Sequence, residues 1–320
     1  MASNSPSAPA RALTSRFYQS EQDFLDMRAM LMEARAQTSD WRYPHVGLMQ
    51  FNFMMVVFHL NAQEFVRLWH VDEKLVGYAI LGEDPSFDVQ VLPGYAWTGI
   101  ETEALAWAEA RVVELRQRDP ERWGGPLVSG AHQDDAQRID FLEQNGFGLR
   151  GEFSEVNMLR SLSEPIPAPT APSGFQLREV AGTEAPLRAA SHRAVWQPWT
   201  VGDISDEDYA RFMQMPGYQR DLDITTVAPE GVFAAAVTGW LDPLNRIGDL
   251  GEVGTLPAYR RQGLMRPALL ECLRRMQAYG MERACVSTGI ENWPAIRLYE
   301  SIGFEPVNQY LDYTKPEQRR

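Results

Sequence analysis

Two short blocks of this 320-residue sequence occur twice, in the same order. The first block places Leu, Pro, Tyr and Gly at the same spacing in residues 92–99 and 256–263. The second block places Glu and a Gly-Phe pair at the same spacing in residues 140–147 and 297–304. These repeats predict two copies of one fold in tandem, and the length agrees with two domains of about 150 residues each.

A proline-rich stretch separates the two copies. Residues 161–174 contain four prolines, a composition typical of an extended spacer. We therefore expect a first domain at 15–160, a linker at 161–174 and a second domain at 175–315. Residues 1–14 are rich in Ser, Pro and Ala and have no apolar segment, so we expect a disordered leader there and not a signal peptide.

The composition excludes several classes of protein. The formal net charge of −13 argues against a nucleic-acid or anionic-membrane partner. Two cysteines make no disulfide framework and favour a reducing cytoplasm. The five histidines have no metal-ligand spacing. The most apolar run, residues 48–60, is too short to span a bilayer, so it is expected to be a buried helix or strand. An oligomer is compatible with the sequence.

Hydrophobic periodicity predicts a mixed α/β domain in the second half, in the order β-α-α-β-β-β-α-β-α-β. The strands are expected at 175–180, 222–228, 232–240, 250–255, 283–288 and 307–313, and the helices at 184–196, 206–214, 263–279 and 292–301. The first half repeats this plan less clearly, with strands expected at 65–71, 75–81 and 87–91.

The stretch from Gly251 to Arg266 carries the clearest chemical information. It runs from an apolar strand, through a turn at Pro257, into a basic loop at the start of a helix. A helix start leaves backbone amides without internal partners, and with the helix dipole and three arginines they form an anion site. Gly263 allows a phosphate to approach the backbone closely. The stretch therefore predicts a phosphorylated ligand beside a strand edge.

Two motifs resemble those of a known family, the GNAT acetyltransferases. Motif A of that family is similar to Arg260-x-x-Gly263-x-Met265, which follows a strand and Pro257, although Met265 replaces a small residue. Motif B is similar to Asn292-x-x-Ala295-x-x-Leu298-Tyr299-x-x-x-Gly303-Phe304. The resemblance covers the second half from Phe175 to about Tyr313 and, in degenerate form, most of the first half. The tandem layout with a weakened first copy is similar to that of the mycothiol synthases.

The resemblance implies the fold and the co-substrate. Each domain would be a mixed, mostly antiparallel twisted sheet flanked by helices, and acetyl-CoA would bind where the strands at 250–255 and 283–288 splay apart. No metal is implied. The residues implied to bind acetyl-CoA are Val253, Gly254 and Thr255 on the strand, Arg260, Arg261, Gln262, Gly263, Leu264 and Met265 in the loop, and Asn292. Asn292 has a second interpretation, as the N-cap of its helix.

The resemblance also implies catalytic roles. Tyr299 would protonate the departing CoA thiolate, and a core tyrosine on an amphipathic helix is the competing interpretation. Glu252 is the first choice for the base that takes the proton of the amine, and a solvent-facing or ion-paired Glu252 is the competing interpretation. The Val253 amide would stabilise the oxyanion. Further candidates are Asp249, Asp203 and His192 as bases, and Trp196, Trp199 and Trp240 at the rim of the acceptor pocket.

The first half lacks this chemistry, because Ala96 and Trp97 stand where Arg260 and Arg261 do, and Leu142 stands at the place of Tyr299. We therefore predict a cytoplasmic tandem enzyme. Its second domain would transfer the acetyl group of acetyl-CoA to a small-molecule amine by direct attack. The alternatives are a non-catalytic acyl-CoA-binding or regulatory protein, and a mycothiol synthase-like enzyme that acetylates a cysteinyl pseudodisaccharide.

Overall fold

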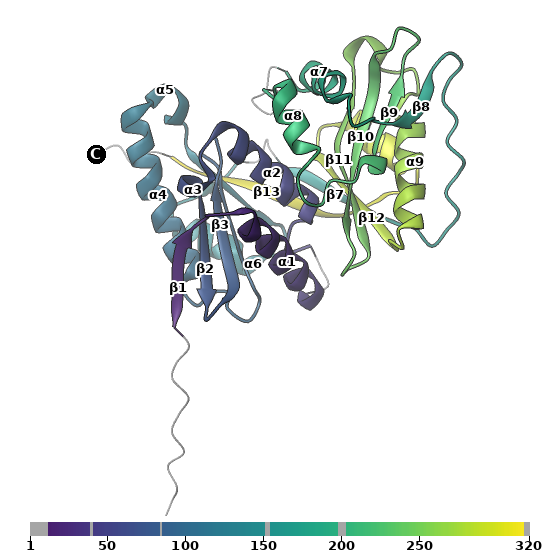
Figure 1. Cartoon of the computed structure of the whole chain (residues 1–320). Coiled ribbons are helices and arrows are strands. Elements are labelled where there is room, and N and C mark those ends of the chain that lie inside the picture. Colours follow the sequence, from purple (N-terminus) through teal and green to yellow (C-terminus); the bar gives the residue numbers. More distant parts are fainter. Residues whose placement is uncertain (1–11, 39–40, 84, 151–153, 198–202, 317–320) are drawn as a thin grey trace, which may run out of the picture.

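The computed structural model describes residues 12–38, 41–83, 85–150, 154–197 and 203–316, which form two lobes (Figure 1). Within these residues the strands form a four-stranded and a nine-stranded sheet. The expected α/β class with a tandem layout is confirmed. The linker prediction coincides with a segment without helix or strand, between Ser161 and Gln176.

The first half begins earlier than its predicted strands. Its strands are β1 (Leu13–Phe17), β2 (Val66–Val71), β3 (Lys74–Leu81), β4 (Phe87–Val91), β5 (Leu127–His132), β6 (Gly148–Leu149) and β7 (Glu155–Ser161). Its helices are α1 (Glu21–Thr38), α2 (Val46–His59), α3 (Ala62–Phe65), α4 (Ile100–Arg118), α5 (Pro120–Trp123) and α6 (Ala136–Gln144). The apolar run at 48–60 is therefore a helix. Strand β1 includes Leu13 and Thr14, and residues 1–11 of the predicted leader lie outside the described residues.

The second half follows the predicted order closely. Its strands are β8 (Gln176–Glu179), β9 (Asp223–Val227), β10 (Phe233–Asp242), β11 (Ile247–Thr255), β12 (Arg283–Gly289) and β13 (Glu305–Lys315). Its helices are α7 (Ala185–Trp196), α8 (Asp206–Phe212), α9 (Met265–Ala278) and α10 (Trp293–Glu300), with short 3-10 turns at Arg220–Leu222 and Pro257–Tyr259. Helix α9 starts later than the predicted residue 263, because Arg261 and Gly263 have φ angles of 63° and 76°, which no α-helix accepts.

The two halves exchange their last strands. Eight strands of the nine-stranded sheet follow the order β5-β13-β7-β12-β11-β10-β9-β8, and the ninth, β6, pairs with β13 outside this order. Strand β7 of the first half thus lies between β12 and β13 of the second, and β13 lies between β5 and β7 of the first. Figure 1 shows β13 running from the second lobe into the first. The sheet therefore continues across the boundary expected near residue 161.

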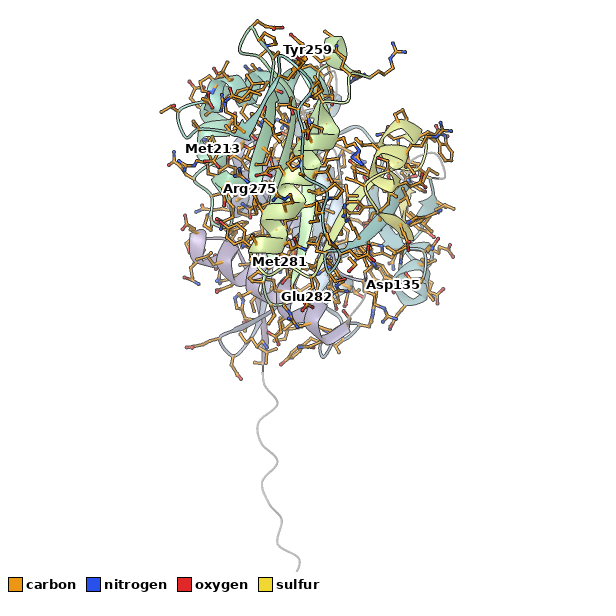
Figure 2. All side chains as sticks on the ribbon, turned by 90° about the vertical axis from the view of Figure 1, so that its right-hand side faces the viewer. Asp135, Met213, Tyr259, Arg275, Met281 and Glu282 are labelled. Carbon is orange, nitrogen blue, oxygen red and sulfur yellow. The ribbon has the colours of Figure 1, made fainter. Side chains whose placement is uncertain are left out.

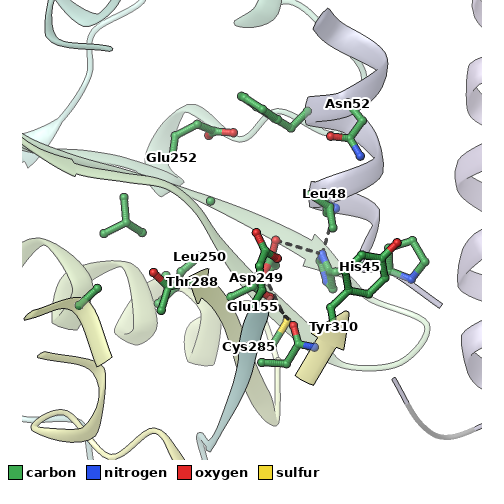
Figure 3. Close-up of a pocket in the computed structure, with 18 of the residues that line it drawn as sticks. His45, Leu48, Asn52, Glu155, Asp249, Leu250, Glu252, Cys285, Thr288 and Tyr310 are labelled. Atoms are coloured by element: carbon green, nitrogen blue, oxygen red, sulfur yellow. Dashed lines mark hydrogen bonds and ion pairs between the residues drawn. The ribbon is translucent and has the colours of Figure 1, made fainter. Parts of the chain in front are cut away.

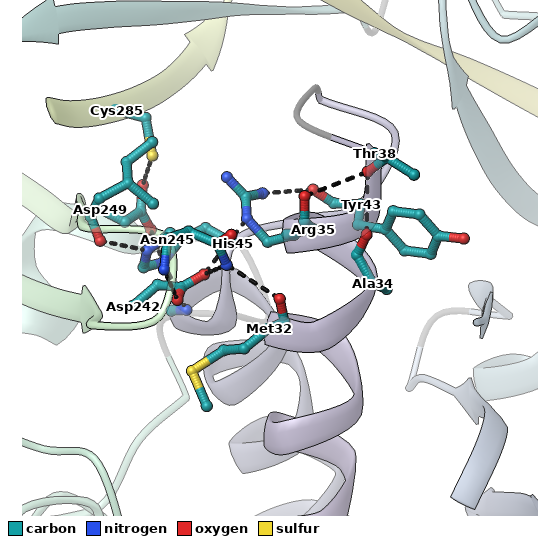
Figure 4. A network of polar contacts seen from close by, with 12 residues as sticks. Met32, Ala34, Arg35, Thr38, Tyr43, His45, Asp242, Asn245, Asp249 and Cys285 are labelled. Carbon is teal, nitrogen blue, oxygen red and sulfur yellow. Dashed lines mark hydrogen bonds and ion pairs between the residues drawn. The ribbon is translucent and has the colours of Figure 1, made fainter. Parts of the chain in front are cut away.

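A polar network joins α1 and the segment before α2 to the second half (Figure 4). Arg35 forms a buried ion pair with Asp242, at 3.5 Å. Asn245 bridges the halves by donating to the Met32 carbonyl at 3.0 Å and to the Asp242 carboxylate at 2.6 Å. The His45 ring contacts the Ile247 carbonyl at 3.2 Å. These contacts fix α2 against β10 and β11, where it forms one wall of the site described below.

Helix α9 packs very closely on the second-half sheet, and two glycines allow this. A Cβ on Gly239 would lie 2.6 Å from the Cys272 sulfur, and one on Gly248 would lie 2.5 Å from the Met276 sulfur. Figure 2 shows Tyr259 near one end of α9, and Met281 and Glu282 beyond the other. The close packing positions the start of α9 at the carboxyl end of β11. In the described part of the chain, no helix is long and apolar enough to cross a bilayer.

Candidate active site

A cleft of about 1470 Å³ lies between the halves and follows a gap in the sheet. Strands β11 and β12 run parallel and pair only from Ile247 to Asp249, opposite Arg283 to Cys285. Beyond Asp249 the two strands separate, and this leaves their facing backbone groups available to a ligand. The predicted splayed pair is therefore present. The cleft is lined by both strands, by α10 and, from the first half, by α2.

A β-bulge shapes the β11 side of this gap. The register between β10 and β11 shifts so that Glu252 and Val253 lie opposite a single residue, Val237. Glu252 adopts a φ of +44°, which is uncommon for a residue with a side chain. Bulges re-aim side chains and interrupt the backbone ladder. Here the bulge brings Glu252 to the cleft wall and disturbs the pairing at Val253, the predicted oxyanion donor.

The loop before α9 has the geometry of an anion site. Helix α9 has no side-chain cap, and among the residues described here the amides of Gly263 and Leu264 donate no hydrogen bond. The Gly263 φ of 76° favours glycine, while no atom lies within 4 Å of where its Cβ would be. Gly263 is therefore required by backbone conformation, and its open surroundings leave space for a ligand.

Most of the predicted acetyl-CoA residues line the cleft. These are Val253, Gly254, Thr255, Arg260, Arg261, Gly263, Leu264, Met265 and Asn292. Gln262 does not line it, and its side chain donates to the Ala258 carbonyl at 3.3 Å. Met265 is only 6% exposed, so most of its side chain lies in the second-half core. Asn292 is the N-cap residue of α10, as its second interpretation predicted, but its side chain makes no capping hydrogen bond and instead donates to the Thr288 hydroxyl at 3.0 Å.

Tyr299 belongs both to the second-half core and to the wall of the cleft. It is 4% exposed and packs edge-on against Phe304, with ring centroids 6.0 Å apart, so it is part of the core. It also lines the cleft. Burial, together with the nearby Asp249 carboxylate, raises the pKa of its hydroxyl above the ordinary value. The hydroxyl therefore stays protonated at neutral pH, as a proton donor must.

Two carboxyl groups on β11 have perturbed acidity. Burial raises the pKa of Asp249 to about 6, although the Cys285 thiol donates to it at 3.4 Å. Burial raises the pKa of Glu252 to about 8, against the opposing effects of Arg188 and a Thr238 hydrogen bond. One Glu252 oxygen is buried without a hydrogen-bond partner. Figure 3 shows Asp249 near His45, Glu155 and Tyr310, and Glu252 set apart from them.

His45 contacts Asp249 but does not neutralise it. Its Nδ1 atom accepts a hydrogen bond from the Gly47 amide at 3.0 Å, so this nitrogen carries no proton and its Nε2 donates to Ile247. Burial lowers the pKa of His45 well below its usual value. The imidazole is therefore neutral, and the 3.8 Å separation from the Asp249 oxygen is not an ion pair at neutral pH.

Sequence reasoning missed two further carboxyl groups in the cleft. Glu155 comes from the exchanged strand β7 and Asp312 from β13, and both line the cleft. Desolvation raises the pKa of Glu155, and Asp312 and Asp249 raise it further. Desolvation also raises the pKa of Asp312, to about 6. These residues lie near β11 only because the halves exchange strands, and no local sequence pattern predicts that exchange.

Other predicted residues lie elsewhere. Asp203 is exposed away from the cleft, and His192 is 1% exposed inside the second half, so neither reaches it. Trp196 and Trp240 do line the cleft, although Trp240 is 1% exposed and packs on Phe212. Trp199 lies outside the described residues. In the described chain, no group of three or more His, Cys, Asp or Glu side chains is placed to hold a metal ion.

Comparisons with known proteins agree with this fold. Residues 190–304 match the model of the acetyltransferase (GNAT) family. A mycothiol acetyltransferase of Thermobispora bispora is 29% identical over 262 residues, covering 76% of this chain and 81% of the relative. The mycothiol acetyltransferase of Nocardia farcinica is also 29% identical, over 76% of this chain and 80% of its own.

Two solved structures have the same fold along nearly the whole chain. A GCN5-related N-acetyltransferase from Sphaerobacter thermophilus superposes with a TM-score of 0.63 at 18% identity, covering 97% of this chain and 96% of its own. A tandem GNAT protein from the clavulanic acid biosynthesis pathway also gives 0.63, at 14% identity, covering 97% and 100%. Residues 190–304 therefore match the GNAT acetyltransferases, a family that uses an acyl-CoA co-substrate. The whole chain has the fold of a tandem GNAT protein and is distantly related to the mycothiol acetyltransferases.

Proposed function

We propose that the second half binds acetyl-CoA and transfers its acetyl group to a small, polar primary amine held between the two halves. The observation that carries this proposal is the continuity of the cleft. It runs from the loop at Gly263, past Tyr299, to the carboxyl groups of Asp249 and Glu155. A co-substrate at one end and an amine at the other would therefore meet at the gap between β11 and β12.

The residues present suit acetyl-CoA. The unbonded amides at Gly263 and Leu264 and the start of α9 provide donors for a diphosphate, with Arg260 and Arg261 beside them. The unpaired edge of β11 after Asp249 provides backbone groups for the amides of the pantetheine arm. When bound, acetyl-CoA supplies an activated acyl group as a thioester.

The transfer needs one proton acceptor and one proton donor. The amine nitrogen forms a bond to the thioester carbonyl carbon, and the carbon–sulfur bond breaks. A carboxylate takes the proton of the amine, and Tyr299 gives its proton to the leaving thiolate. Asp249 is the better acceptor, because its pKa of about 6 leaves it largely ionised at pH 7, whereas Glu252, at about 8, is mostly protonated. Glu252 is the alternative acceptor.

The acceptor end of the cleft favours a cation. Burial raises the pKa of Asp249, Glu155 and Asp312, and the first and last of these raise the pKa of Glu155 further, so each group would gain from a positively charged neighbour. An ammonium group, or an amine with a second positive group, provides that charge. The pseudodisaccharide of a mycothiol synthase-like reaction carries an amine and many hydroxyls, and the relationship to the mycothiol acetyltransferases makes it the second candidate.

The experiment is a thiol-release assay with the full chain, acetyl-CoA and a panel of amines. The panel contains diamines, amino sugars, the cysteinyl pseudodisaccharide, and the N-acetylated form of each as a matched control. We expect turnover with a cationic amine, and a several-fold rise in the acceptor KM, with an unchanged acetyl-CoA KM, in Glu155→Gln. Glu305→Gln, on an exposed part of β13, serves as the control. Acetyl-CoA binding without turnover of any amine would instead support the non-catalytic alternative.

A further inference from the structure

The first half repeats the backbone of the second-half site. Strands β4 and β5 also separate: they lie in different sheets, and Val128 of β5 pairs with the residues just before β4, through a bridge to Ser86 and a hydrogen bond to the Pro85 carbonyl at 2.7 Å. In the loop that follows β4, Trp97 and Gly99 have φ angles of 62° and 121°. Arg261 and Gly263, at the same spacing after the shared Leu-Pro, have 63° and 76°. The two halves therefore carry the same splayed strands and similar loops before α4 and α9.

The first-half loop already holds an anion, and it belongs to the protein. One oxygen of the Glu101 carboxylate accepts a hydrogen bond from the Trp97 amide at 2.9 Å, and the other oxygen is buried without a hydrogen-bond partner. Glu101 is 5% exposed, so this group is enclosed. Counted from the shared proline, Glu101 stands where Met265 stands in the second half, and Met265 offers no charge to its loop.

The gap between β4 and β5 is also filled from within. The Arg138 guanidinium donates to the Gly130 carbonyl on β5 at 2.6 Å and to the Val89 carbonyl on β4 at 2.8 Å. It also pairs with Asp88 at 3.3 Å. Counted from the shared glutamate, Arg138 stands where Ala295 stands in α10. In the second half the side chain at this position is the small Ala295, which leaves the gap open. In the first half the Arg138 guanidinium fills the gap and bonds both strands.

We infer that Glu101 and Arg138 occupy, inside the first half, the places that the diphosphate and the pantetheine amides of acyl-CoA take in the second half. The first half is then a self-ligated copy of the site: it binds no acyl-CoA and serves as a fixed wall of the acceptor cleft, which Arg138 lines. This inference rests on the proposed function of the second half. It predicts that each chain binds one acyl-CoA, and that Glu101 and Arg138 are what prevent a second from binding in the first half.

Amide hydrogen exchange in the unmodified full chain gives the first test, with CoA as the added ligand. The Trp97 amide is expected to exchange slowly with or without CoA, because Glu101 already protects it. The amides of Gly263 and Leu264 are expected to exchange quickly without CoA and at least ten-fold more slowly with it. Protection of residues 95–101 that depends on CoA would overturn the inference. No CoA-dependent protection anywhere would contradict the proposed function instead.

A graft gives the second test, using second-half residues in their own register. Ala96→Arg/Trp97→Arg restores only the cations, whereas Ala96→Arg/Trp97→Arg/Glu101→Met/Arg138→Ala also removes both internal groups. Equilibrium dialysis is expected to find one equivalent of CoA for the unmodified chain and the double variant, and two for the quadruple variant. The equivalent of CoA that binds to the second half shows that each variant is folded. A second equivalent in the double variant, or its absence in a folded quadruple variant, would refute the inference.

Discussion

The loop at residues 92–101 and the loop at residues 256–265 share a backbone shape and differ in what fills them. Both carry a residue with a left-handed φ two positions before a glycine with positive φ. In the first loop a buried glutamate bonds the Trp97 amide, and in the second the amides of Gly263 and Leu264 remain open. The first loop thus makes with its own glutamate a contact that the second loop leaves open.

A similar contrast is found at one pair of equivalent positions on the strands before these loops. Counted back from the shared Leu-Pro, Asp88 on β4 corresponds to Glu252 on β11. Asp88 is paired with Arg138, whereas Glu252 has an oxygen without a partner and a pKa raised to about 8 by burial. A carboxyl group that the first half neutralises is left unsatisfied in the second. Unsatisfied buried groups of this kind mark places where a ligand or a proton completes the structure.

The largest expected effect comes from Tyr299, which has only Leu142 as its first-half counterpart. Tyr299→Phe is expected to lower kcat roughly 100-fold with little change in either KM, because a general acid contributes about 10²–10⁴. Steady-state kinetics measure this. Tyr279→Phe, which removes an exposed hydroxyl bonded to Asp221, is the control and should keep full activity. A Tyr299→Phe variant with normal kcat would reduce Tyr299 to its packing role.

The next largest effect is the pH dependence of kcat/KM, which tests whether Asp249 or Glu252 is the proton acceptor in the second half. The base must be ionised, so kcat/KM is expected to fall as the pH drops through the pKa of Asp249, with a midpoint near 6. Asp249→Asn should remove most of the activity across the profile. A midpoint near 8 that persists in Asp249→Asn and disappears in Glu252→Gln would transfer the role to Glu252.

The two loop glycines give a matched pair with a smaller effect. Gly263→Ala forces a side chain into a left-handed conformation, at a cost of about 1–2 kcal/mol, and shifts the loop amides. We expect a roughly ten-fold higher acetyl-CoA KM on this reasoning. Gly99→Ala meets similar strain in the first half and should lower the melting temperature without moving that KM. Equal KM effects from both variants would place acyl-CoA in both halves.

The smallest effect concerns the stability of the chain. The raised pKa of Glu252 means that its contribution to stability is complete below the unfolded value of 4.5 and is lost as pH rises through about 8. Glu252→Gln removes this loss, so it should stabilise the protein clearly more at pH 9 than at pH 5, where little of the loss has yet occurred. Thermal unfolding at the two pH values measures the difference. Equal shifts at both would mean that Glu252 does not titrate as described.

Much of the second half was predictable, because its information is local. Turn and cap residues marked the ends of its elements: Ser205, for example, forms the expected N-cap, here as a capping box with Asp208. The strand exchange was not predictable, because the partners of β7 lie more than a hundred residues away and no short-range pattern encodes them. The acceptor-side carboxyl groups Glu155 and Asp312 were missed for the same reason.

The loop residues of the site could be predicted because a helix start and a glycine are recognised from residues that are neighbours in the sequence. The bulge at Glu252 was not, since it depends on the register against β10. The roles of Glu101 and Arg138 were also hidden, although both stand in the aligned blocks or next to them. The repeats alone show which second-half residues the first half lacks, whereas the contacts of Glu101 and Arg138 depend on the three-dimensional structure.

The position of β13 has a consequence for how this chain comes into being. During synthesis the first half emerges early, but the strand that belongs between its β5 and β7 is encoded by residues 305–315. Until those residues leave the ribosome, two strand edges stay open to solvent and to other chains. The final assembly step therefore joins both lobes at once, and a chain that stops short of residue 305 leaves the nine-stranded sheet that spans them without its connecting strand.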